Sequence, residues 1–143
     1  MKIIGFNLTK ISVNKKEKFE GKIEVNQNID IKNIVKEEIP ITNEEVLKID
    51  FDFQINYSGD FAKLEFVGNI LIIPEKEELK NILKSWKDKE KKIPDESRVP
   101  LFNFIMSKCN IKALLLEDEI NLPYHIPMPR INFPEKEKVQ GKA

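Results

Sequence analysis

The amino-acid sequence predicts an α+β domain in which a four-stranded antiparallel meander precedes two helices and a proline-rich extended C-terminal arm. Two observations support this fold. Apolar residues alternate with polar ones over much of residues 3–73, and they recur at helical spacing between residues 75 and 116. A chain of 143 residues suits one hydrophobic core. We expect a single domain over residues 1–133 and a flexible polar tail over residues 134–143.

The clearest strand covers residues 45–57, where every second residue is apolar and most of the others are polar. The turn-forming segment Ser58-Gly59-Asp60 follows. The same alternation then resumes over residues 61–73. These two segments are therefore predicted to form a hairpin.

Two earlier segments complete the predicted sheet, over residues 3–13 and 22–35. All four segments are longer than the usual strand of about five or six residues. A sheet with such strands should be bent or strongly twisted. Gly21, Gly59 and Gly68 are the candidate positions for bends.

Pro74 ends the last strand, and residues 75–90 are predicted to form the first helix, with acidic side chains in its first turn. Pro100 fits the first turn of a second helix over residues 100–116. Both helices should pack on one face of the sheet. Apolar side chains cover most of the second helix, which indicates that it is buried or shared with another subunit.

Composition excludes several classes of function. Lys+Arg and Asp+Glu balance at 24 each, so no overall field attracts nucleic acid or an anionic membrane. The apolar run at residues 1–6 is too short for a signal peptide, and no apolar run approaches the ~20 residues of a membrane span, so we expect a cytoplasmic protein. The many Lys and Glu residues are typical of thermophiles, although AT-rich coding would also produce the many Lys and Ile residues.

The search for chemistry yields three weak candidates. Asp50 and Asp52 share one face of a strand, as metal ligands or paired acids would, but a solvent-exposed sheet face has the same pattern. Cys109 and His125 are each the only residue of their type; a pairing between them is conceivable, whereas a buried thiol and a packing histidine are the simpler interpretation. The five glycines form no phosphate-binding loop, so nucleotide chemistry is not expected. Because no motif joins a nucleophile, a base or a set of metal ligands, we expect no enzyme, no cofactor and no metal site.

The apolar inventory is large for one small core. The strand over residues 45–57, the second helix and the arm over residues 122–129 all carry large apolar side chains. They either pack on one another or form a surface for assembly or binding. The residues predicted to bind polypeptide are Phe51, Phe53, Phe102, Phe104, Tyr124 and Met128.

This order of elements resembles the SecB-type protein-export chaperones. In that family the second helix starts with a Leu-Phe-Pro-Tyr-like stretch and a Pro-x-Leu-x-Leu-x-Pro-like arm follows it. The counterparts here are Leu101-Phe102-Asn103-Phe104 and the segment from Leu122 to Ile131. Asn103 replaces the family's proline, residues 110–121 contain no glycine, and the neutral chain lacks a strongly acidic surface for a secretion motor.

The resemblance implies a chaperone that assembles, typically as a tetramer, and holds unfolded polypeptide in apolar grooves without hydrolysing nucleotide. Such a holdase needs apolar area and no reactive group. The alternative is a structural or adaptor subunit that docks on a larger complex such as the ribosome through the same apolar helix. In either case the expected partner is protein, including further copies of this chain.

Overall fold

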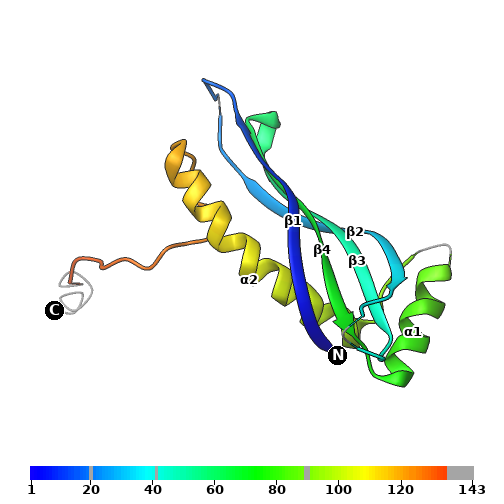
Figure 1. Ribbon diagram of the computed structural model, residues 1–143. Coiled ribbons are helices and arrows are strands. Elements are labelled where there is room, and N and C mark those ends of the chain that lie inside the picture. Colours follow the sequence, from blue (N-terminus) through cyan, green and yellow to red (C-terminus); the bar gives the residue numbers. More distant parts are fainter. Residues whose placement is uncertain (20, 41, 89–90, 135–143) are drawn as a thin grey trace.

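The computed structural model describes residues 1–19, 21–40, 42–88 and 91–134, and within them an antiparallel sheet carries a long helix across one face (Figure 1). The elements are, in order, β1 (Lys2–Lys15), β2 (Val25–Glu37), β3 (Val46–Tyr57), β4 (Ala62–Ile73), α1 (Lys76–Lys87) and α2 (Asp95–Glu119). The predicted α+β class, with four antiparallel strands and then two helices, is confirmed. The predicted tail lies outside the described residues, apart from Pro134.

The hairpin of β3 and β4 forms as predicted. Its strands pair without a register shift from Leu47 opposite Ile72 to Tyr57 opposite Ala62. A single 3-10 turn over Ser58–Asp60 joins them. Gly59 has a φ of 64° in this turn, a conformation that glycine adopts without steric cost.

The strand order is β1-β4-β3-β2, so the meander prediction is wrong for the first strand. β2, β3 and β4 follow one another as hairpins, but β1 pairs with β4 at the far edge, from Lys2 opposite Ile73 to Lys15 opposite Ala62. The connection over residues 16–24 is long enough to cross the end of the sheet. No tight turn holds β1 beside β2, whereas pairing with β4 places its apolar residues over the shared core.

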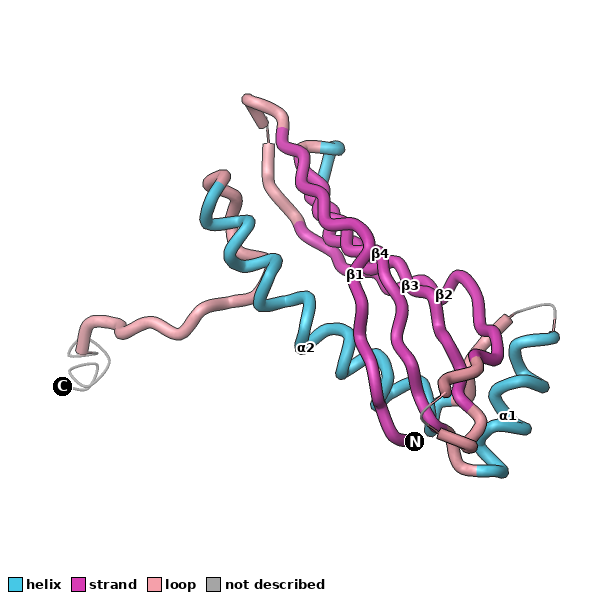
Figure 2. The backbone as a smooth tube through the Cα atoms, viewed as in Figure 1, coloured by secondary structure: helices cyan, strands magenta, loops and turns pink. Residues whose placement is uncertain are grey.

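The sheet is strongly twisted along its length, as expected for long strands (Figure 2). β1 contains two register shifts, and β2 contains one between Ile31 and Asn33. Such bulges increase the local twist of a strand. Gly68 has a different role from the predicted bend, because a Cβ atom there would lie 2.1 Å from the carbonyl oxygen of Asn7 on β1.

The core lies between the sheet and α2. β3 and β4 contribute alternate side chains that are fully buried: Leu47, Ile49, Phe51, Phe53, Ile55, Leu64, Phe66, Ile70 and Ile72. α2 contributes every fourth residue, namely Leu101, Ile105, Cys109 and Ala113. Ile82 of α1 completes the same cluster. This i, i+4 stripe explains how a helix that is apolar over most of its surface still presents one defined face to the sheet.

α2 begins five residues before the predicted start, so Pro100 lies inside the helix rather than near its first turn. Pro100 removes one backbone donor, but the segment before it has other support. The amide groups of Ser97 and Arg98 donate to the carbonyl of Pro94, at 3.0 and 2.8 Å. The Ser97 hydroxyl also donates to Glu78 of α1 at 2.7 Å, which ties the start of α2 to α1.

Candidate polypeptide-binding surface

The two flanks of α2 differ in what they contact. On the β1 side, Phe104 meets the ring of Phe6 edge-on at 5.8 Å between centroids. Phe6 in turn stacks on the buried Phe51 at 5.7 Å. On the β2 side, Phe102 lines a cleft between the helix and strand β2. The two aromatic side chains near the start of α2 therefore point to opposite edges of the sheet.

The cleft beside β2 has a volume of about 280 Å³. We call it the β2-side cleft. Its apolar lining consists of Ile29 and Ile31 from β2, Ile93 from the connection before α2, and Phe102. Its charged rim consists of Lys91, Lys92 and Arg98. Asp30 also borders the cleft from β2, but it pairs with Asp52, so its side chain lies on the opposite sheet face. An apolar groove with a polar rim beside a sheet edge is the arrangement that accepts extended peptide.

The outward side of α2 carries further apolar residues. Ile111 and Leu115 are 64% and 65% exposed and are spaced four residues apart, so they form one patch. We call this pair the outer patch. It lies away from the stripe that packs on the sheet, and no described residue covers it.

The structure divides the six predicted binding residues into three groups. Phe51 and Phe53 are 0% exposed, because they belong to the inner strand β3 beneath α2. They are core residues, and their assignment to a surface is corrected here. Phe102 and Phe104 are half-buried on the flanks of α2.

Tyr124 and Met128 lie in the C-terminal arm and are 45% and 49% exposed. They are separated from Phe102 because Phe102 lies near the start of α2, whereas the arm follows the end of that helix and runs away from the sheet (Figure 1). The predicted set is thus not one continuous site. The sequence reasoning also missed Ile29, Ile31 and Ile93, which line the β2-side cleft with Phe102. The alternation of apolar and polar residues in β2 already placed Ile29 and Ile31 on one face of the strand, and this pattern could have indicated them.

The arm begins with a buried polar clamp. His125 Nδ1 lies 2.7 Å from Glu117 Oε2, and neither side chain is exposed. His125 Nε2 lies 2.8 Å from Asn110 Oδ1, and the His125 amide donates to Glu117 Oε1 at 3.0 Å. The Tyr57 hydroxyl donates to the carbonyl of Pro123, and burial is the main cause of the raised pKa of this phenol. The arm is therefore attached to both α2 and β3.

The contacts of His125 also bear on the conceivable pairing of Cys109 with His125. His125 contacts Glu117 and Asn110, and among the described residues it forms no hydrogen bond with Cys109. Cys109 is fully buried, and burial raises the pKa of its thiol to about 11. A thiol with that pKa stays protonated at neutral pH and is a poor nucleophile. Cys109 acts as a small core residue.

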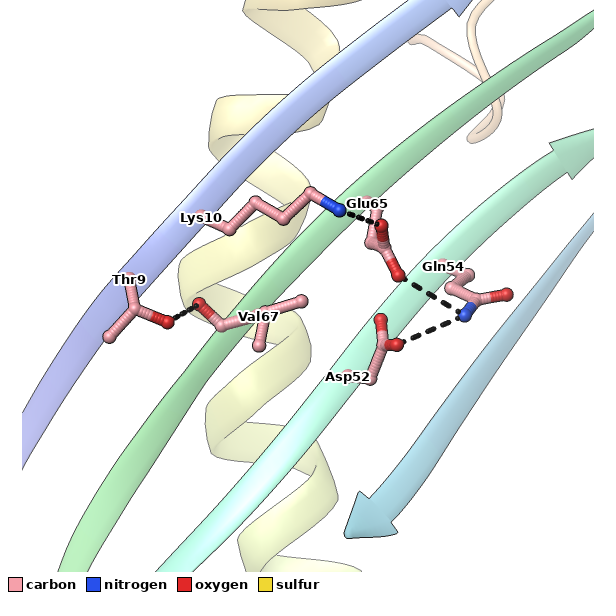
Figure 3. Close-up of polar contacts among 6 residues, drawn as sticks. All are labelled: Thr9, Lys10, Asp52, Gln54, Glu65 and Val67. Carbon is pink, nitrogen blue, oxygen red and sulfur yellow. Dashed lines mark hydrogen bonds and ion pairs between the residues drawn. The ribbon is translucent and has the colours of Figure 1, made fainter.

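Asp52 lies on the sheet face opposite α2, in a polar network with neighbouring strands (Figure 3). The Gln54 amide donates to Asp52 at 3.1 Å and to Glu65 at 3.4 Å, and Lys10 pairs with Glu65 at 2.8 Å. Burial raises the pKa of Asp52, whereas the hydrogen bond from Lys10 lowers that of Glu65. Within the described ranges, no group of three or more His, Cys, Asp or Glu side chains could hold a metal ion.

No family model matches the sequence, and neither does any curated protein. Among solved structures, the chain matches the SecB-like chaperone Rv1957 of Mycobacterium tuberculosis, solved in complex with a ChAD peptide from the Rv1956 HigA1 antitoxin. The TM-score is 0.51 at 13% sequence identity, and the match covers 92% of this chain and 87% of that one. The fold is SecB-like. At this identity the match concerns the fold alone.

The SecB-like fold also bears on the long apolar helix. By length and composition alone, α2 could cross a membrane. This differs from the sequence-based expectation that no apolar run approaches the length of a membrane span. Core helices of soluble proteins meet the same criterion, and α2 packs its Leu101, Ile105 and Cys109 side chains on the sheet. The helix is thus weak support for a membrane protein.

Proposed function

We propose that this chain binds extended or unfolded polypeptide without performing chemistry, as a SecB-like holdase. The observation that carries the proposal is the β2-side cleft, which places an apolar lining directly beside an edge strand of the sheet. An extended guest can pair its backbone with such an edge while alternate side chains enter the cleft. The solved structure with a similar fold contains a bound peptide, which is consistent with this use of the fold.

The apolar lining and the charged rim of the β2-side cleft contribute differently to binding. Ile29, Ile31 and Phe102 offer contact area that is not specific for one side chain, which suits varied clients. The charged rim stays in water and sets orientation more than affinity. Binding of this kind shifts the client away from aggregation by mass action and needs no nucleotide.

The direct test is light scattering from an unfolded, aggregation-prone client, with and without added nucleotide. We expect the protein to suppress scattering equally in both conditions. Phe102→Ser should weaken suppression, while Val35→Ser should not, because Val35 is an exposed apolar residue on the opposite sheet face. Equal suppression by both variants would place the site elsewhere. No suppression, together with tight retention on ribosomes, would favour the adaptor alternative.

A further inference from the structure

The end of the arm is built like a short, unpaired strand. Residues 127–134 extend away from the domain (Figure 2). Ile131 is 100% exposed and Phe133 is 93% exposed. Because side chains alternate in an extended chain, these two apolar residues share one side, and Arg130 and Asn132 share the other. Pro129 and Pro134 bracket four residues that each keep a backbone donor.

Strand β2 is the edge that can accept such a segment. Both β1 and β2 lie at edges of the sheet. β1 is interrupted by two register shifts, whereas β2 pairs with β3 in unbroken register from Val25 to Ile31. A regular edge presents evenly placed donors and acceptors, and bulges disrupt that array. The β2-side cleft lies along the same regular stretch, beside Ile29 and Ile31.

The side chains of the two segments are complementary. If Ile131 and Phe133 align with Ile29 and Ile31 on the cleft side, Arg130 falls on the opposite sheet face. Asp30 occupies that face of β2, is 45% exposed, and has a long ion pair of 3.8 Å with Lys32. In that register Asn132 lies directly opposite Asp30, and Arg130 lies diagonally from Asp30, two positions along β2. A long side chain reaches that distance, so Arg130 can pair with the carboxylate.

We propose that residues 130–133 of one copy add as a strand to β2 of a second copy, with Ile131 and Phe133 in its β2-side cleft. A second copy is the occupant because the clamp at His125 fixes the start of the arm on its own α2. From that point the arm runs to the side of the molecule opposite β2 and α1 (Figure 1). The proposal concerns self-assembly, and a docked arm would compete with foreign polypeptide for the same cleft and the same edge.

Disulfide trapping between two full-length variants tests the proposal. In a Cys109→Ala background, one variant carries Phe133→Cys and a second, tagged to differ in mass, carries Ile29→Cys. In a buffer of oxidised and reduced glutathione, the oxidised form accepts the two electrons, and we expect a disulfide that joins the two different chains. The matched control replaces Ile29→Cys with Ile11→Cys on the other edge strand, and its yield should be at least about tenfold lower.

The same two substitutions, combined in one chain, show whether the arm docks on a second copy or on its own chain. A single chain that carries both Phe133→Cys and Ile29→Cys should form dimers rather than an internal bond when concentrated. An internal bond whose yield is unaffected by dilution would overturn the proposal in favour of docking on the chain's own cleft. Equal yields with Ile29→Cys and Ile11→Cys would overturn it as well.

Charge reversal provides a second readout. Arg130→Glu should lower the trapping rate by about two- to fivefold, and adding Asp30→Lys to the partner variant should restore it. No effect of Arg130→Glu would refute the proposed register. If trapping succeeds while client aggregation is not suppressed, the holdase function fails and the docking stands. If client aggregation is suppressed while trapping fails, only the docking proposal is overturned.

Discussion

His125 Nδ1 lies 2.7 Å from Glu117 Oε2, and both side chains are completely buried at the junction of α2 and the arm. Their separation in sequence is eight residues, so the pair closes a short loop across the end of the helix. Leu122 is buried in the same loop and donates its amide to the Glu117 carbonyl at 2.8 Å. The arm is thereby part of the domain as far as His125.

We predict that His125→Ala lowers the free energy of unfolding by about 3 kcal/mol, because it leaves the Glu117 carboxylate buried and uncompensated. Urea denaturation measures this change. The double variant His125→Ala/Glu117→Leu should regain much of the loss, since it removes the unpaired charge as well. A double variant as unstable as His125→Ala alone would show that the carboxylate is not the source of the penalty.

Gly68→Ala should destabilise the pairing of β1 with β4. The added Cβ would lie 2.1 Å from the backbone carbonyl of Asn7, which cannot move independently of β1. We expect a loss of more than about 2 kcal/mol, with faster amide exchange along β1. Gly5→Ala is the matched control, since its Cβ meets the movable Cδ1 atom of Leu71 at 3.2 Å. Similar losses in both variants would contradict a specific role for Gly68.

Asp52→Asn should raise stability at neutral pH. Burial raises the folded-state pKa of Asp52, so its favourable contribution is present below the unfolded pKa and is lost as pH rises through the folded value. Asparagine removes that cost and keeps an acceptor for Gln54. The expected gain is at most about 1 kcal/mol, because water near the open sheet face screens the charge.

The pH dependence of Asp52→Asn is the sharper measurement. Thermal melts of both proteins should differ most at neutral pH and converge at pH values below the unfolded pKa of an aspartate. A wild-type protein that is more stable than Asp52→Asn at neutral pH would mean that the ionised carboxylate is favourable in the folded state. Asp50→Asn provides the control on the same strand.

Self-association should depend on the outer patch of α2 in addition to the docked arm. Ile111 and Leu115 are exposed apolar neighbours, so Ile111→Ser/Leu115→Ser should shift the protein towards the monomer of 16.7 kDa. Sedimentation equilibrium at micromolar concentration measures this, and a loss of at least about tenfold in association is expected. Wild-type protein that sediments as a monomer would contradict the prediction, as would unchanged association in the double variant.

The strands and helices were predictable because their signals are local. Alternation over residues 45–57 and 61–73, with turn residues between them, identifies a hairpin without reference to the rest of the chain. The sequence favoured a packing or surface role for His125, and the structure shows that Glu117 and Asn110 contact its ring. The start of α2 was predicted too late, because contacts to Glu78 and Pro94 outweigh the preference of Pro100 for a first turn.

The sequence by itself determined the fold class, the hairpin, and a helix with more apolar surface than one face can bury. Only the tertiary structure decided that β1 lies beside β4, that Phe51 and Phe53 are core, and that Phe102 lines a cleft with Ile29 and Ile31. The physical reason is the range of the interactions. Periodicity reports which side of an element is apolar, whereas strand order and burial depend on contacts between residues far apart in the chain.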